Sequence, residues 1–210
     1  MKRIVLRFVQ CVSFFVFVFV LYQYFTQGWL IDIDHSLMAK LYQLRSDFGV
    51  HFFLFVTLGA SPAAVLAVVG YYLILFFREK QIKRAVMTFF GLMCAEAMTA
   101  VLKIGLHRAR PDLLLRAMSE DSFSLPSGHA TSAAFVFGYI GYQSYLRSRT
   151  TQRTIWIFSL TLFFVFLIDL SRLYLSVHYL SDVLLGNAIG FFVLSILIGR
   201  DLRTKRNVLS

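Results

Sequence analysis

The stretch "SRLYLSVHYLSD", residues 171–182, places an arginine, a histidine and an aspartate between two strongly apolar segments. Those segments cover residues 155–170 and 183–198. Ionisable groups are costly in hydrocarbon, and those close to membrane helices usually face a charged partner or a water-filled cavity. The stretch therefore predicts two membrane helices that are joined at a functional site.

The composition of the chain excludes an ordinary soluble protein. Of its 210 residues, 58% are hydrophobic, only 15% are charged and 23 are phenylalanine. The mean hydropathy is +0.69, and such values are typical of a membrane protein. The formal net charge of +10 does not indicate a nucleic-acid-binding protein, because the basic residues are dispersed among the apolar segments instead of clustered on one face.

Six segments are candidates for membrane spans, each of which needs about 20 apolar helical residues. They are residues 4–25, 51–77, 85–106, 130–146, 155–170 and 183–198. The last three are short, and we expect them to thin the bilayer or to rest on neighbouring helices. No repeat or linker interrupts the chain. The prediction is therefore one all-α polytopic membrane domain that covers residues 1–210, with six transmembrane helices.

The distribution of basic residues predicts the orientation of this bundle. An even number of spans places both termini on the same side. Most of the 21 lysines and arginines lie in the N-terminal segment, after the second span, after the fourth span and in the C-terminal tail. By the positive-inside rule these regions are cytoplasmic. We therefore expect both termini in the cytoplasm of a cell-membrane protein, and the first, third and fifth loops on the periplasmic or extracellular side.

The first outer loop has the pattern of an amphipathic helix. Its apolar residues recur at helical spacing while its charged residues lie elsewhere on the helical wheel: Ile33, Leu37, Leu41 and Leu44 against Asp34, His35, Lys40 and Arg45. This pattern predicts a helix that lies in the membrane interface. Its simplest role is to cover the end of the bundle, and guiding lipid entry is the alternative.

Three polar clusters fall at the outer ends of the predicted spans. They are "KIGLHRARP" at residues 103–111, "PSGH" at residues 126–129 and the stretch at residues 171–182. A phosphoryl group in transfer carries negative charge on its oxygens, so its catalysis depends on positioning and on cations. Lys103, Arg110 and Arg172 offer three such cations, and an arginine can bind phosphate through two parallel hydrogen bonds.

The "PSGH" cluster opens a predicted helix. The backbone amides of Ser127, Gly128 and His129 are expected to be unpaired there and to point outward, which makes an anion site. Gly128 allows close approach of the backbone to a ligand. The Ser127 hydroxyl adds a further donor.

Two histidines can supply bond formation and proton transfer. His178 and Asp182 are four residues apart, so on a helix they share a face, and the carboxylate can hold the ring in the tautomer whose other nitrogen is free to attack. His129 lies on a different helix and can protonate a leaving oxygen.

Several further charged residues each have two alternative roles. Glu96 either pairs with Lys103 or lines the cavity, and Asp169 either steers Arg172 or is a helix-end charge. The third-loop residues His107, Arg108 and Arg116 are expected among lipid headgroups, with contact to a second phosphate as the alternative.

The three motifs together resemble a known signature. K-x6-R-P at residues 103–111, P-S-G-H at residues 126–129 and S-R-x5-H-x3-D at residues 171–182 resemble the three-part signature of the type-2 phosphatidic acid phosphatase superfamily. The resemblance spans residues 103–182 and includes every signature position. Common relatives often carry glycine where this chain has Ser176.

This resemblance implies a helical bundle like that of the vanadium haloperoxidases, and a phosphatase that uses neither a metal nor another cofactor. It implies that His178 forms a phosphohistidine, that Asp182 orients His178 and that His129 is the general acid. The implied phosphate-binding residues are Lys103, Arg110, Ser127, Gly128 and Arg172.

A site at the outer ends of membrane helices suits a substrate whose tail stays in the bilayer. We therefore expect a lipid phosphate or diphosphate, such as undecaprenyl diphosphate, phosphatidylglycerol phosphate or phosphatidic acid. Two alternatives remain open: a phosphotransferase that passes the phosphoryl group to another lipid headgroup, and, from a different class, an anion or lipid transporter. The residues do not determine the preferred lipid or the oligomeric state.

Overall fold

The computed structural model describes residues 2–209, and the side chains of residues 4–202. The described chain is helical throughout, without strands, so the predicted all-α class is confirmed. Its elements are α1 (Lys2–Thr26), α2 (Trp29–Gln43), α3 (Asp47–Thr57), η1 (Leu58–Ala60), α4 (Pro62–Arg78), α5 (Ile82–Leu106), η2 (Leu113–Leu115), α6 (Gly128–Leu146), α7 (Thr151–Tyr174) and α8 (Leu180–Leu209).

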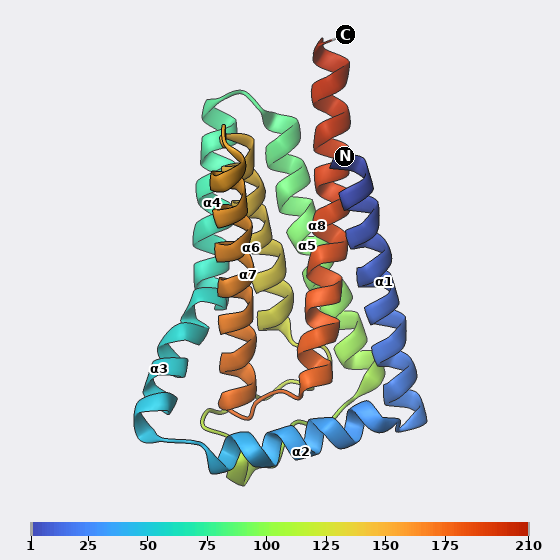
Figure 1. The fold of residues 1–210 in the computed structure, drawn as a ribbon, viewed down its shortest axis with the longest axis vertical. Helices are drawn as coiled ribbons and strands as arrows, with labels where there is room; N and C mark the ends of the chain where they lie inside the picture. The colour runs from blue at the N-terminus through green and yellow to red at the C-terminus, as the bar shows by residue number, and fades with distance from the viewer. Residues whose placement is uncertain (1, 210) are drawn as a thin grey trace.

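The long helices form an upright bundle around α6 (Figure 1). Five helical segments of the described chain are long and apolar enough to cross a membrane: Ile4–Thr26, Asp47–Arg78, Ile82–Leu106, Thr151–Tyr174 and Leu180–Leu202. The fourth predicted span, residues 130–146, is not among these five segments and corresponds to α6, which packs against α4, α5, α7 and α8. Because neighbouring helices cover α6, small and polar residues such as Thr131 and Ser132 are tolerated in its buried positions.

Two details of the predicted spans are wrong. The second span is not continuous, because η1 and Ser61 separate α3 from α4. Pro62 is the first residue of α4, and the Ser61 side chain accepts a hydrogen bond from the Ala64 amide at 3.3 Å. Proline favours the first turn of a helix and ends the helix before it. In addition, α7 and α8 have 24 and 30 residues, so neither is a short span.

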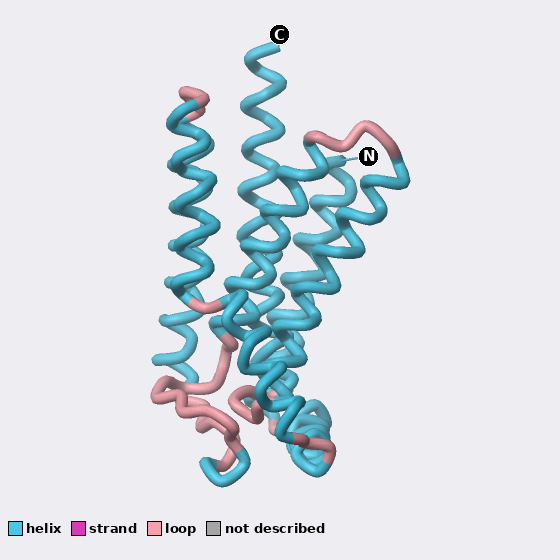
Figure 2. The backbone as a smooth tube through the Cα atoms, turned by 90° about the vertical axis from the view of Figure 1, so that its left-hand side faces the viewer, coloured by secondary structure: helices cyan, strands magenta, loops and turns pink. Residues whose placement is uncertain are grey.

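The helix predicted in the first loop is confirmed as α2, which lies across one end of the bundle (Figure 1). Figure 2 shows that several loops gather at this same end. Leu37 and Leu41 pack against the bundle, whereas Ile33 and Leu44 are exposed. Asp34 was expected on the polar face, but it is only 1% exposed. It faces the bundle because it has buried hydrogen-bonding partners there.

Close contact between α6 and α8 depends on two glycines of α8. A Cβ atom on Gly186 would lie 2.5 Å from the Ser127 carbonyl oxygen, and one on Gly190 would lie 2.5 Å from that of Thr131. Only glycine permits the backbones to approach this closely. The first turn of α6 is thereby held beside the first turn of α8, where Asp182 lies.

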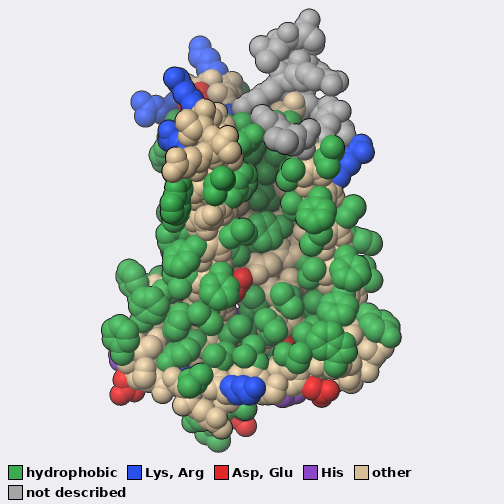
Figure 3. All heavy atoms as spheres, viewed as in Figure 1, with side chains coloured by type: hydrophobic (Ala, Val, Ile, Leu, Met, Phe, Trp, Pro, Cys, Tyr) green, Lys and Arg blue, Asp and Glu red, His purple; other side chains and the backbone are tan. Residues whose placement is uncertain are grey.

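The surface has the distribution of side chains that a bilayer requires. Figure 3 shows hydrophobic side chains over the middle of the visible face, and charged side chains gathered towards the two ends. Many large hydrophobic residues are exposed, among them Phe15, Phe55 and Phe163. Such an extensive exposed apolar surface is expected where lipid, not water, is the solvent.

Candidate active site

The three polar clusters of the sequence lie together at the α2 end of the bundle. His178 is in the turn between α7 and α8 and is 1% exposed. Arg110, in the loop after α5, has Nη1 3.2 Å from His178 Nε2 and donates a 2.8 Å hydrogen bond to the Val177 carbonyl. The first and third clusters are therefore in direct contact, although 68 residues separate Arg110 from His178.

His178 and Asp182 face each other as expected, but they do not share a helical face, because His178 lies in the turn before α8. His178 Nδ1 lies 3.4 Å from Asp182 Oδ2. The same oxygen accepts hydrogen bonds from the Tyr179 amide at 2.8 Å and from the Ser124 hydroxyl. Burial lowers the pKa of His178 from 6.5 to about 3, and the opposing effect of Asp182 is smaller. The ring is therefore neutral at physiological pH, as a nitrogen nucleophile must be.

Arg172 and Arg110 share one carboxylate, that of Glu120. Arg172 Nη2 donates to Glu120 Oε1, and Arg110 Nη2 lies 3.4 Å from Glu120 Oε2. Burial alone would raise the pKa of Glu120. The combined effect of the two arginines, which lowers this pKa, is larger, so the pKa lies below its ordinary value. Glu120 is a site residue that the sequence analysis missed, because nothing in the local pattern distinguishes it from other acids of the loop.

The two arginines are held by different neighbours. Arg172 is fully buried and donates to Thr57 Oγ1 at 2.8 Å. Its Nε is buried and has no hydrogen-bond partner among the described residues. Arg110 Nε donates to the Ser122 carbonyl at 2.6 Å. Lys103, from the last turn of α5, reaches the same loop and donates to the Phe123 carbonyl.

The "PSGH" segment forms the start of α6, but only part of it is an open anion site. The Ser127 amide donates to the Asp182 carbonyl at 2.9 Å, and the Ser127 hydroxyl accepts from the Ala130 amide at 3.4 Å. The expectation that all three amides are unpaired is therefore wrong for Ser127. Within the described part of the chain, the amides of Gly128 and His129 have no acceptor.

The space in front of Gly128 is empty. A Cβ atom on this residue would have no heavy atom within 4 Å. His129, the next residue, interacts electrostatically with Arg172, Glu120 and Arg110. The start of α6 therefore has open space beside Gly128, close to charged residues of the site.

Several expectations about the remaining charged residues are corrected by the structure. Glu96 accepts a 2.6 Å hydrogen bond from Ser132, and no ion pair joins it to Lys103 among the described residues. Asp169 accepts a 2.6 Å hydrogen bond from Asn187 and not from Arg172. Glu96 thus links α5 to α6, and Asp169 links α7 to α8. Helical spacing alone does not specify which neighbouring residue lies opposite each acid.

Arg108 is not a headgroup-facing residue. Its side chain is 8% exposed and lies between the carboxylates of Asp182 and Asp34, at 2.8 and 2.7 Å. Arg116 donates to the Pro111 carbonyl at 2.7 Å, and the His107 ring packs against Phe123. The loop after α5 therefore folds inward, because its basic groups find carboxylates and carbonyls there.

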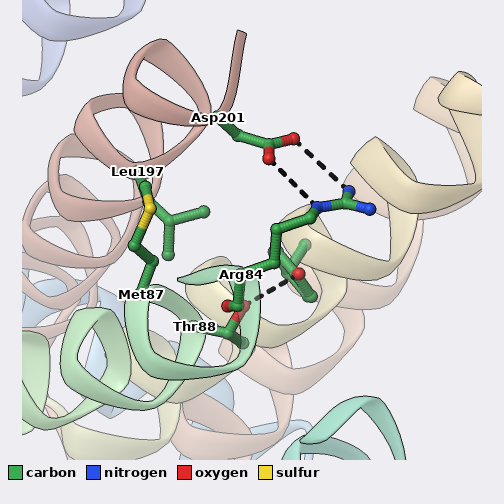
Figure 4. Close-up of a pocket in the computed structure, with 6 residues that line it drawn as sticks. Arg84, Met87, Thr88, Leu197 and Asp201 are labelled. Carbon is green, nitrogen blue, oxygen red and sulfur yellow. Dashed lines mark hydrogen bonds and ion pairs between the residues drawn. The ribbon is translucent and has the colours of Figure 1, made fainter. Parts of the chain in front are cut away.

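A second polar cluster lies at the opposite end of the bundle (Figure 4). Arg84 Nε pairs with Asp201 Oδ1 at 3.0 Å, and Asp201 Oδ2 accepts from the Tyr142 hydroxyl at 2.7 Å. The adjoining cavity, of about 10 Å³, admits a single water at most. We interpret this cluster as an anchor between α5, α6 and α8, not as a substrate site.

Known proteins similar to this chain include members of one phosphatase superfamily. Residues 84–200 match the PAP2 superfamily. Phosphatidylglycerophosphatase B of Bacillus subtilis (strain 168) is 34% identical over 108 residues, which are 50% of this chain and 52% of that protein. The chain thus spans about half the length of this curated relative.

Two crystal structures share the fold. A transmembrane PAP2-type phosphatidylglycerolphosphate phosphatase from Bacillus subtilis gives a TM-score of 0.79 at 23% identity, covering 91% of this chain and 96% of the other. LpxE from Aquifex aeolicus gives a TM-score of 0.62 at 20% identity, and the match covers 80% of this chain and 95% of LpxE. The family match covers more than half of the chain and includes all three motifs, and we conclude that the chain belongs to the PAP2 superfamily.

Proposed function

We propose that this protein is a membrane-embedded phosphatase that releases phosphate from a lipid phosphate or diphosphate through a phosphohistidine on His178. The observation that carries the proposal is the environment of His178. This ring is buried and neutral, faces Asp182 with Nδ1 and has Nε2 beside Arg110. A neutral imidazole held between a carboxylate and a cluster of cations is suited to attack phosphorus.

The first chemical step forms the covalent intermediate. Arg110, Arg172 and the free amides at the start of α6 hold the phosphate oxygens. His178 Nε2 bonds to phosphorus while the bond from phosphorus to the leaving oxygen breaks. Burial lowers the pKa of His129 to about 4, so His129 takes up its proton when the negative charge of the bound phosphate raises this pKa again. It then gives that proton to the leaving oxygen, and the lipid alcohol or lipid phosphate leaves. Asp182 stabilises the positive charge that develops on the His178 ring.

The second step regenerates the enzyme. A water molecule attacks the phosphohistidine, and His129 takes its proton. The bond between phosphorus and Nε2 breaks, its electron pair returns to the ring, and inorganic phosphate leaves. Transfer to a lipid headgroup in place of water would be a phosphotransferase reaction, which differs only in the acceptor.

A lipid substrate is supported by the position of the site and by the relatives. The site lies at the ends of helices that have membrane-spanning length, beside the amphipathic α2. The curated relative is named for phosphatidylglycerophosphate. We therefore propose phosphatidylglycerol phosphate as the first substrate to test, with undecaprenyl diphosphate and phosphatidic acid beside it.

We also propose that both termini are cytoplasmic and that the active site faces the periplasm or the cell exterior. Both termini lie at the end of the bundle away from α2 (Figure 1). Lysine and arginine side chains gather at that end on the visible face (Figure 3). The positive-inside rule makes this end cytoplasmic.

The test measures phosphate release by the detergent-solubilised protein with EDTA present. The three lipids are offered without any acceptor other than water. We expect His178→Ala to turn over at least about 10³-fold more slowly than the wild type, and His51→Ala, which changes an exposed histidine of α3, to keep wild-type activity. Wild-type turnover by His178→Ala would exclude the nucleophile. Phosphate release only after a lipid acceptor is added would identify a transferase.

A further inference from the structure

Arg108 joins the site to the interfacial helix α2. Its Nη1 donates to Asp182 Oδ1 at 2.8 Å, and its Nη2 donates to Asp34 Oδ2 at 2.7 Å. Asp34 belongs to α2 and is 1% exposed, and Asp182 is fully buried. One guanidinium thus bridges two buried carboxylates from elements that are far apart in the sequence.

The bridge is tightly enclosed. The Asp34 carboxylate also accepts from the Ser181 amide at 2.9 Å and from the Ser181 hydroxyl. The Arg108 guanidinium lies over the ring of Tyr179, 4.4 Å from its centroid. These contacts fix both the position and the plane of the guanidinium, because a planar fork pairs with carboxylates in few orientations.

The two oxygens of Asp182 have separate tasks. Oδ1 is bound by Arg108, whereas Oδ2 faces His178 and is bound by Tyr179 and Ser124. A buried carboxylate that loses its cation is strongly disfavoured and turns or takes up a proton. Either change would remove the oxygen that holds the His178 ring. The direction of Asp182 therefore depends on Arg108.

We propose that Arg108 and Asp34 are positioning residues that aim Asp182 at His178, so that α2 supplies part of the active site and does not only cover it. This inference rests on the proposed role of His178. It assigns a role in the turnover step to Arg108, which occupies no signature position, and to Asp34, which lies outside the motif region altogether. Neither residue contacts Arg172 or Glu120 in the described structure.

The role predicts which kinetic constant changes. The pair acts on the orientation of the nucleophile, so its loss lowers kcat, while the substrate still meets the same cations and KM stays within about threefold. We expect Arg108→Gln to turn over about 10- to 100-fold more slowly, on the order seen when residues that orient a reactive group are removed. Arg108→Lys keeps the positive charge but lacks the planar guanidinium with its paired donors, so its kcat should lie between those of Arg108→Gln and the wild type.

Asp34→Asn gives a second variant that preserves side-chain size. It removes the charge of Asp34 but leaves one oxygen that can accept from the Ser181 amide, and Arg108 keeps its pair with Asp182. We expect kcat to fall by about 10-fold, and the melting temperature of the variant shows whether it remains folded. The double variant should lose no more than Arg108→Gln alone, because both changes break one connected unit. The matched control is Arg116→Gln, since Arg116 lies in the same loop and contacts the Pro111 carbonyl instead of a carboxylate.

The experiment measures kcat and KM for phosphate release from the lipid that the wild type hydrolyses, with His178→Ala in the same series. The expected result is a loss in kcat for Arg108→Gln and Asp34→Asn, partial recovery in Arg108→Lys and wild-type kcat in Arg116→Gln. Wild-type kcat in Asp34→Asn, or a loss confined to KM, overturns the inference while an inactive His178→Ala leaves the proposed function standing. An active His178→Ala overturns both.

Discussion

The Glu120 carboxylate lies against the guanidinium of Arg172, one of the cations that we propose to bind phosphate. Its second oxygen faces Arg110 at 3.4 Å. A carboxylate offers arginine the same planar pair of acceptor oxygens as one face of a phosphate. In the proposed reaction Glu120 therefore competes with the substrate phosphate for these two arginines.

Removing the charge of Glu120 should tighten anion binding. We expect Glu120→Gln to lower the inhibition constant for inorganic phosphate by about threefold to tenfold, because Arg172 and Arg110 then lack a negative partner, and about 1 kcal/mol corresponds to roughly a fivefold change in a binding constant. The measurement is inhibition of lipid hydrolysis by added phosphate. Glu79→Gln is the control, since Glu79 is a surface acid that contacts Gln81. Weaker inhibition in Glu120→Gln would show that Glu120 helps to bind the anion.

The general acid should matter most when the leaving oxygen is a poor leaving group. His129→Ala should reduce kcat by about 10²-fold or more on a lipid alkyl phosphate. The loss should be smaller on a diphosphate or an aryl phosphate, because those oxygens leave without needing a proton. The measurement is the ratio of turnover rates for the two substrate types in the variant and in the wild type. An equal loss on both would assign His129 to phosphate binding instead.

The pKa of His178 predicts how stability depends on pH. The pKa is about 3 in the folded protein and 6.5 as its ordinary value. Between these two pH values the unfolded chain therefore binds more protons than the folded protein. The contribution of His178 to the free energy of unfolding is fully present above pH 6.5 and is lost as the pH drops from 6.5 towards 3. We expect the melting temperature of the wild type to fall more between about pH 7 and about pH 5 than that of His178→Gln. Equal shifts in both proteins would contradict a depressed pKa.

The close approach of α6 to α8 makes Gly186 sensitive to a single methyl group. In Gly186→Ala the new Cβ meets the Ser127 carbonyl, which belongs to the backbone and cannot turn away. We expect a loss of stability of about 1–3 kcal/mol together with a loss of activity, because the start of α6 shifts relative to Asp182. Gly199→Ala is the control on the same helix, since its Cβ meets no atom within 4 Å. It should be neutral or stabilising.

Local patterns along the chain were sufficient for the class of fold and for the motifs of the site. Hydropathy marks the spans because each one must be apolar over its own length. The pairing of His178 with Asp182 is expected from their spacing on a helix, but His178 lies in the turn before α8, so the path of that turn and not a shared helical face brings the two side chains together. The break before Pro62 is also readable from the sequence, since proline is a local constraint, although the apolar run of residues 51–77 continues across it.

Contacts between distant segments were decided only by packing. Arg108 and Arg110 are two residues apart and look alike in the sequence, yet one contacts Asp182 and the other His178. Arg108 reaches Asp34 across 74 positions, and Arg172 reaches Glu120 across 52. The helical period says which residues share a face, but the partner of a buried charge depends on which loop folds against that face. The loop that folds there is the one that gives every buried charge a partner at the same time, and this requirement can be met only in the assembled bundle.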